Sequence, residues 1–271
     1  MSSMNARDSN PHRRAWQSGD YSDAASQSLL VSELLCEAVE LRAGERVLDV
    51  ACGTGITTLA AARRQADVIG IDFATNALET ARRRAEFEGL DVDFREGDAE
   101  ALPFADNSFD VVLSTFGAQF VADQDAAARE LVRVCRSGGR IGLTNWTPRP
   151  FFGHFLKLMA DYAPPQMSKS PIPEKPGVLW GTEERLQELF GDLVNAIHAE
   201  RRVSRSRYRS VDAWVAATTQ HLGPAIQILQ QVDEETGKAF VRDLTALVER
   251  FNRSPGPDVL LESDYLEVVM I

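Results

Sequence analysis

The first half of the chain alternates short apolar runs with amphipathic stretches. Runs rich in branched apolar residues predict strands at 47–50, 68–71, 92–94, 109–113 and 140–146. Helical spacing of apolar positions within 20–44, and over 56–64, 76–87 and 123–136, predicts helices around and between these strands. This alternation predicts an α/β fold with a parallel sheet and helices on both faces.

The second half is less regular, and seven prolines interrupt residues 148–176. Residues 183–190 and most of 214–250 have helical patterns, whereas 201–209 and 265–271 have the patterns of strands. Because these two strands can join the same sheet, we expect one domain over 20–271, with halves 20–146 and 147–271. The polar residues 1–19 lack the apolar core of a signal peptide, and we expect them to form a disordered lead-in.

Composition narrows the classes of function. The chain has 271 residues and a formal net charge of −11, which argues against binding to nucleic acid or to an anionic membrane. No segment approaches the roughly 20 apolar residues that span a bilayer. Cys36, Cys52 and Cys135 are widely spaced and form no CxxC pair, so neither a disulfide framework nor a metal site is expected. A reducing cytoplasm is the expected location.

Acidic residues follow successive predicted strands, where parallel sheets bind their ligands. After the first strand, Gly53 and Gly55 allow a ligand to approach the backbone. Asp49 in the same segment would repel a phosphate and attract an ammonium or a sulfonium group. A dinucleotide-binding turn has a small third residue where this chain has Thr58.

The next two strand ends carry Asp72 and Asp98. A carboxylate at the second strand end can accept hydrogen bonds from both ribose hydroxyls, and one at the third can accept from an adenine amino group. Either residue alone is equally well explained as a helix cap or a turn residue. Three acids in order favour a cationic ligand that contains a nucleoside.

Four segments resemble the class I S-adenosylmethionine-dependent methyltransferases, in particular the group of small-molecule enzymes that includes the ubiquinone and menaquinone C-methyltransferases. They are VLDVACGTG (47–55), VIGIDF (68–73), GDAEALPFADNSFDVV (97–112) and ELVRVCRSGGRIGLTNW (130–146). The resemblance implies a Rossmann-like, doubly wound, seven-stranded sheet with its last strand antiparallel and with extra helices over the acceptor side. It implies S-adenosylmethionine as cofactor and a monomer or homodimer.

The resemblance also implies roles for individual residues. Those that would contact the cofactor are Ala51, Gly53 and Gly55 (methionine part), Asp49 (its orientation), Asp72 (ribose), Phe73, Asp98 and Ala99 (adenine), and Thr115 or Ser114 (methyl end). Trp16 and Tyr21 would either close over the cofactor or simply pack against other aromatic residues.

Catalysis and acceptor binding leave fewer traces in the sequence. Methyl transfer by in-line displacement depends mainly on alignment, and a base is needed only when the acceptor arrives protonated. His154 and His221 are candidate bases, although an ordinary packed or exposed histidine is the better explanation of each. Gln119, Trp146 and Trp180 are candidate acceptor contacts or core residues.

The arginine run over 201–209 has two interpretations. Alternation places Arg205, Arg207 and Arg209 on one strand face, where they would bind an anionic acceptor or form a solvated surface. On the first interpretation, replacing Arg205 and Arg207 with alanine raises the KM of that acceptor.

These observations predict methyl transfer from S-adenosylmethionine to a small, partly apolar metabolite. The fourth strand ends in Ser-Thr-Phe-Gly and lacks the loop of enzymes that methylate base amino groups, which disfavours DNA and rRNA acceptors. One alternative is a family member that binds the cofactor and catalyses another step, such as a cyclisation. An NAD(P)-dependent oxidoreductase is disfavoured by Thr58 and Asp49, and a degenerate binding protein by the three intact acids.

Overall fold

A single seven-stranded sheet runs through the protein, with strand order β3-β2-β1-β4-β5-β7-β6. The structure is a computed structural model and describes residues 11–164 and 175–271. Strands β1 to β5 are parallel, and β7 is antiparallel to both β5 and β6. The strands are β1 (Arg46–Val50), β2 (Asp67–Asp72), β3 (Asp93–Glu96), β4 (Phe109–Thr115), β5 (Cys135–Trp146), β6 (Ile197–Tyr208) and β7 (Val259–Met270). This topology confirms the predicted fold class.

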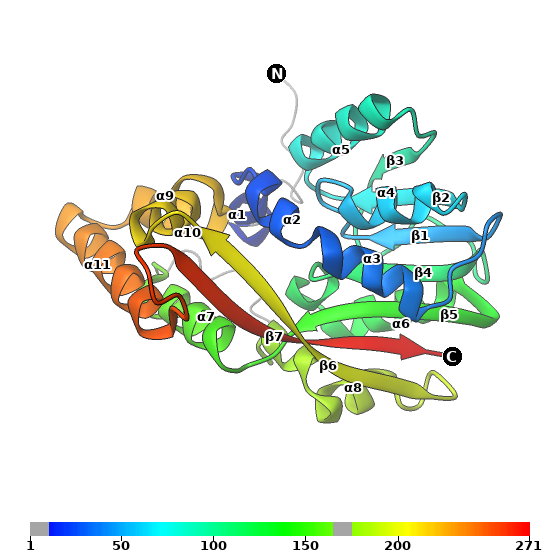
Figure 1. Cartoon of the computed structure of the whole chain (residues 1–271). Coiled ribbons are helices and arrows are strands. Elements are labelled where there is room, and N and C mark those ends of the chain that lie inside the picture. Colours follow the sequence, from blue (N-terminus) through cyan, green and yellow to red (C-terminus); the bar gives the residue numbers. More distant parts are fainter. Residues whose placement is uncertain (1–10, 165–174) are drawn as a thin grey trace, which may run out of the picture.

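Helices cover both faces of this sheet (Figure 1). They are α1 (Pro11–Gln17), α2 (Ser22–Gln27), α3 (Leu29–Ala38), α4 (Ile56–Arg63), α5 (Thr75–Glu88), α6 (Gln124–Val134), α7 (Phe151–Tyr162), α8 (Glu183–Phe190), α9 (Val211–His221), α10 (Gly223–Gln231) and α11 (Glu234–Phe251). Strand residues alternate between two hydrophobic clusters: Val47 packs with α3 and α4, whereas the next residue, Leu48, packs with α6 and α8. Both side chains are completely buried, as expected for a central parallel strand.

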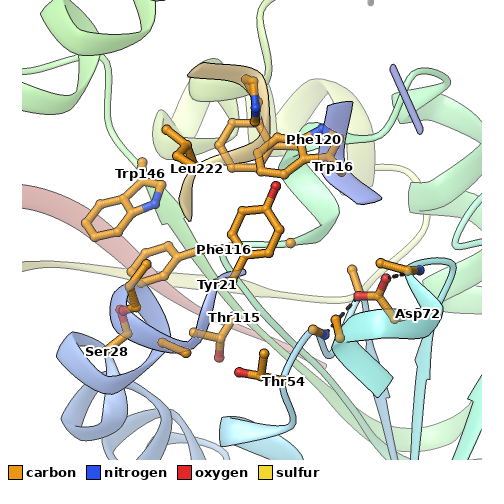
Figure 2. Close-up of a pocket in the computed structure, with 18 of the residues that line it drawn as sticks. Trp16, Tyr21, Ser28, Thr54, Asp72, Thr115, Phe116, Phe120, Trp146 and Leu222 are labelled. Carbon is orange, nitrogen blue, oxygen red and sulfur yellow. Dashed lines mark hydrogen bonds between the residues drawn. The ribbon is translucent and has the colours of Figure 1, made fainter. Parts of the chain in front are cut away.

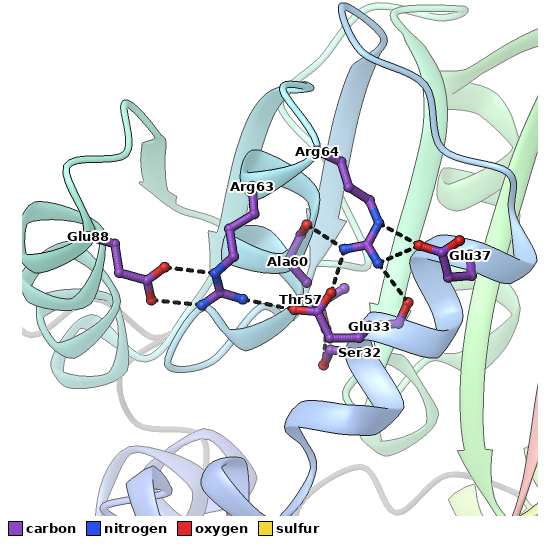
Figure 3. A network of polar contacts seen from close by, with 8 residues as sticks. All are labelled: Ser32, Glu33, Glu37, Thr57, Ala60, Arg63, Arg64 and Glu88. Carbon is purple, nitrogen blue, oxygen red and sulfur yellow. Dashed lines mark hydrogen bonds and ion pairs between the residues drawn. The ribbon is translucent and has the colours of Figure 1, made fainter.

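Ion pairs join α3, α4 and α5 outside the hydrophobic core (Figure 3). Arg64 at the end of α4 donates hydrogen bonds to Glu33 and, at 2.6 Å, to Glu37 of α3. Its neighbour Arg63 donates to Glu88 at the end of α5 at 2.7 Å. These contacts hold α3 and α5 beside α4, the helix that follows the first strand-end turn.

Strands β6 and β7 extend beyond the rest of the sheet. They pair along all twelve residues, whereas β5 pairs only with residues 265–270 of β7. Helices α7, α9, α10 and α11 pack on the projecting part, where Val259 and Leu261 of β7 join their core. The predicted start of the last strand at 265 is therefore six residues late.

Residues 214–250 are mostly helical, as predicted, and they belong to three helices, because Gly223-Pro224 begins α10 and the side chain of Asp233 caps α11. The segment 151–162 lies within the stretch that prolines interrupt, for which the sequence predicts no helix, and it forms the helix α7. The prolines on either side of this segment interrupt the helical pattern, so the sequence does not reveal its apolar face.

The expected disordered lead-in over 1–19 is wrong from Pro11 onward, and residues 1–10 lie outside the described part. Helix α1 buries Ala15, and Gln17 donates a hydrogen bond to the carbonyl of Phe73 at 3.3 Å. A seven-residue helix has little intrinsic stability, so its contacts with distant segments maintain it. The sequence of α1 contains no sign of those contacts.

Candidate functional site

A cavity of about 760 Å³ lies beyond the carboxyl ends of the parallel strands (Figure 2). Its lining comes from the turns after β1, β2, β3 and β4, and from α1, α2, α7, α9 and the projecting part of β6 and β7. The predicted residues that line it are Ala51, Gly53, Asp72, Phe73, Asp98, Ala99, Thr115, Trp146 and His221, together with Trp16 and Tyr21. The fold thus brings most of the strand-end residues to one site.

The turn after β1 has an unusual backbone. Ala51, Gly53 and Gly55 all have positive φ, at 53°, 53° and 81°. A side chain added at Gly53 would meet no atom within 4 Å, whereas one at Gly55 would lie 2.9 Å from Ala81 of α5. Gly53 therefore opens toward the cavity, and Gly55, which does not line it, allows α5 to pack closely.

Asp72 holds this turn in place. Its two carboxylate oxygens accept hydrogen bonds from the backbone N–H of Gly53 and of Ala74, each at 2.8 Å. Burial raises the pKa of Asp72, and the backbone donors oppose that shift. Each carboxylate oxygen has a further lone pair available for a hydroxyl in the cavity.

Asp98 has a partner that the sequence analysis missed. Arg13 of α1 forms an ion pair with Asp98, and its guanidinium lies 5.1 Å from the ring centroid of Phe73. Asp98 also accepts a hydrogen bond from the N–H of Glu100 at 3.0 Å. The N-terminal helix therefore reaches the two residues expected at the adenine.

Asp49 lies behind the turn and does not line the cavity. It is 1% exposed, and one oxygen accepts a hydrogen bond from the Thr58 hydroxyl at 2.6 Å. The other oxygen has no hydrogen-bond partner in the described part of the chain. Burial raises the pKa of Asp49 to about 7.

Aromatic rings form the other end of the cavity. Phe116, directly after β4, has a positive φ of 58°, which is an uncommon backbone conformation for a bulky residue. Its ring stacks on Trp146 at a centroid distance of 3.7 Å, and Trp146 stacks on Phe152 at 4.6 Å. Thr115, one residue earlier, accepts a hydrogen bond from Thr57 at 2.7 Å, so the polar and aromatic ends meet at the end of β4.

Several predicted residues lie elsewhere. Trp180 is completely buried against Phe190 of α8, and Gln119 is completely buried with its amide donating to the carbonyl of Phe116. His154 is exposed on α7, where Nδ1 lies 2.6 Å from the carbonyl oxygen of Pro150. The structure therefore assigns Trp180 and Gln119 to packing and removes His154 from the cavity, because helix and strand geometry turns these side chains away from it.

The arginine run also lies away from the cavity. Arg205 is exposed and donates to Glu262 of β7 at 3.0 Å, and Arg207 is exposed beside it. Neither side chain is among those that line the cavity. The structure therefore favours the solvated surface over a binding face for an anionic acceptor.

Sequence comparisons relate the chain to methyltransferases. Residues 48–143 match a family described as a methyltransferase domain. An uncharacterized protein of Mycobacterium tuberculosis is 37% identical over 259 residues, which are 94% of this chain and 92% of the relative. A demethylmenaquinone methyltransferase of Thermus thermophilus is 40% identical over 144 residues, which are 48% of this chain and 66% of that enzyme.

Solved structures share the architecture. The YcgJ protein from Bacillus subtilis has a TM-score of 0.62 at 24% identity, covering 89% of this chain and 98% of that one. The [4+2]-cyclase SpnF has a TM-score of 0.54 at 23% identity, covering 90% of this chain and 80% of that one. The chain belongs to the class I S-adenosylmethionine-dependent methyltransferases. Within the described residues, no helix is long and apolar enough to cross a membrane.

Proposed function

We propose that this protein binds S-adenosylmethionine and transfers its methyl group to a small, largely apolar acceptor. The observation that carries the proposal is one continuous cavity with acidic strand ends on one side and stacked aromatic rings on the other. Thr115 and Phe116 stand where the two parts meet. A cofactor bound along the strand ends would present its reactive group to an acceptor lying against the rings.

The residues of the polar end suit the cofactor. Asp72 would accept hydrogen bonds from the ribose, and the open backbone at Gly53 would take the methionine part. Asp98, Ala99 and Phe73 would surround the adenine after the ion pair between Arg13 and Asp98 has opened. When bound, the cofactor supplies an electrophilic methyl group on a positively charged sulfur.

The protein's own contribution is alignment and exclusion of water. Trp16 and Tyr21 line the cavity from the N-terminal segment, with ring centroids 5.8 Å apart, and would cover the reacting groups. His221 lines the cavity and is the remaining candidate for a base when the acceptor arrives protonated. In-line displacement needs no covalent intermediate, so this arrangement is chemically sufficient.

Calorimetric titration with S-adenosylhomocysteine and with NAD(P) tests the cofactor assignment. We expect S-adenosylhomocysteine to bind, and Asp72→Asn to weaken binding by about tenfold or more, because hydrogen bonds to a charged group are lost. Asp67→Asn is the matched control, since Asp67 is exposed at the opposite end of the same strand. Binding of NAD(P) without S-adenosylhomocysteine, or equal behaviour of the two variants, would contradict the assignment.

A screen against a metabolite library with S-adenosylmethionine tests the reaction, with methyl transfer detected as a mass shift of the acceptor. We expect at least one apolar acceptor to gain a methyl group. Cofactor binding with products of unchanged mass would instead indicate a step such as a cyclisation.

A further inference from the structure

Strand β6 presents two different faces. Ser204, Ser206 and Tyr208 line the cavity, whereas Arg205 and Arg207 between them are exposed on the opposite face. The register of the antiparallel pair sets Ser204 directly opposite Ser263 of β7, which also lines the cavity. Three serine hydroxyls therefore lie on one wall, which we call the serine wall (Ser204, Ser206 and Ser263).

The hydroxyls of the serine wall are available to a ligand. None of the three makes a hydrogen bond to another residue within the described parts, 11–164 and 175–271. Tyr208, the next cavity residue along β6, differs because its hydroxyl donates to Asp23 at 2.7 Å. Ser263 is only 8% exposed, so the cavity is the direction from which a partner can reach its hydroxyl.

The serine wall adjoins the aromatic end of the cavity. Ser263 lies two residues from Tyr265 on the same face of β7, and Tyr265 pairs in register with Trp146. The rings of Tyr265 and Phe116 meet edge to face at 5.6 Å. Tyr265 is buried beneath the rings of Phe116 and Trp146, which line the cavity, and a flat apolar body lying against those two rings would have its edge toward the serine hydroxyls.

Apart from Asp72 at the polar end, the acidic side chains and the arginine that line the cavity already have partners within the protein. Arg13 is the one arginine or lysine among the described lining residues, and it is paired with Asp98. The acids nearest the N-terminal segment are also occupied: Asp23 accepts from Tyr208, and Asp20 accepts from the N–H of Ser22 at 3.0 Å. Glu100 accepts from two backbone N–H groups, at 2.8 and 2.9 Å.

We propose that the serine wall binds the polar edge of an uncharged acceptor, which carries hydroxyl or carbonyl oxygens on an otherwise apolar, planar body. That the ligand is a methyl acceptor rests on the proposed function. That it is uncharged and polar at one edge rests on the unpaired serine hydroxyls and on the charged side chains that already have partners. The serine wall offers no unpaired cation to an anionic acceptor and no unpaired carboxylate to an ammonium group. Burying either charge there would therefore cost free energy without compensation.

Calorimetry with three two-ring probes tests the proposal: 2-naphthol (neutral), 2-naphthoate (anionic) and 2-naphthylmethylamine (cationic at pH 7). We expect 2-naphthol to bind at least about fivefold more tightly than either charged probe. Ser204→Ala and Ser263→Ala should each weaken 2-naphthol binding by about threefold to tenfold, because a neutral hydrogen bond is lost. Arg205→Ala, on the other face of the same strand, should leave it unchanged.

Several results would overturn the proposal: tighter binding of a charged probe, no binding of 2-naphthol, or unchanged affinity in both serine variants. Circular dichroism and thermal unfolding of each variant show whether it folds, and Ser206→Ala offers a third position on the wall. A separate titration with S-adenosylhomocysteine keeps the two ideas apart. Its failure contradicts the proposed function, whereas failure of the naphthol series with intact cofactor binding contradicts the serine wall alone.

Discussion

The three strand-end acids have the same side chain and three different environments. Asp72 is held by two backbone N–H groups at the cavity, Asp98 is paired with an arginine, and Asp49 is buried behind the turn with one oxygen unpartnered. The sequence predicts a strand-end position for all three, because each lies in or shortly after a short apolar run. Their different surroundings come from different partners: Thr58, nine residues along the chain, for Asp49, and Arg13, 85 residues away, for Asp98.

Burial of Asp49 predicts a pH dependence of stability. Its pKa is raised to about 7 in the folded protein, against about 3.9 in an unfolded chain. The contribution of this carboxyl to the free energy of unfolding is therefore fully present below about pH 4. It is lost as the pH rises from there through 7, because the carboxyl ionises in the unfolded chain before it ionises in the folded protein. Asp49→Asn removes this titration, so the variant should gain stability relative to the wild type between pH 5 and pH 8, on the order of 2 kcal/mol.

Urea unfolding of the two proteins at both pH values measures this difference. Asp67→Asn serves as the control and should follow the wild-type pH profile, because Asp67 is exposed. Parallel profiles for Asp49→Asn and the wild type would show that the Asp49 carboxyl does not titrate in this range.

At the scale of elements, the site depends on how closely two turns approach. A Cβ atom at Gly117, after β4, would lie 2.6 Å from Cβ of Ala51 and 2.7 Å from its carbonyl oxygen. Both contacts are to the turn after β1, whose backbone is already restricted by Asp72. The turns that form the polar end and the aromatic end of the cavity are therefore in direct contact.

Gly117→Ala should separate these turns. We expect a loss of about 1–3 kcal/mol in the free energy of unfolding, as for other overpacked sites, together with weaker binding of S-adenosylhomocysteine. Gly237→Ala in α11 is the control, because the nearest atoms would lie at 3.5 and 3.8 Å. That variant should be unchanged or gain up to about 1 kcal/mol. Urea unfolding and calorimetry measure both effects, and equal behaviour of the two variants would exclude a close contact at Gly117.

At the scale of the whole molecule, the net charge of −11 matters for the ligand. The acids of the lining outnumber its cations, and they come from three separate segments of the chain: Asp20 and Asp23, Asp72, and Asp98 and Glu100. At the strand ends this acidic field favours a positively charged ligand over a neutral one of the same shape, whereas the serine wall itself carries no carboxylate.

This field predicts a salt effect on ligand preference. S-adenosylmethionine carries one positive charge more than S-adenosylhomocysteine, on its sulfur. Raising the ionic strength from about 0.01 M to about 1 M shortens the screening length from roughly 30 Å to roughly 3 Å. We expect the affinity for S-adenosylmethionine to fall severalfold more than that for S-adenosylhomocysteine, as measured by calorimetry. An equal change for both ligands would mean that the acids do not act on the sulfonium.

The sequence predicted the central elements well, because their signals are local. The strands around Val47 and Val68 and the glycine turn at 53–55 depend on short apolar runs and on glycine conformations, and each appears close to its predicted position. The prediction failed for α1 and α7, whose sequences are short or flanked by prolines and whose stability comes from distant contacts.

The sequence by itself determined the α/β sheet and the order of the acidic strand ends, since both depend on patterns within a few residues. Only the tertiary structure decided which side chains share the cavity. It removed His154, Trp180 and the arginine run, and it added Arg13, Phe116 and the serine wall. The physical reason is that the direction of a side chain depends on the register of neighbouring strands and on helices packed from far along the chain. The alternation of residues in β6 predicts two faces, one with serines and one with arginines. Only the pairing of β6 with β7 determines that the serines face the cavity.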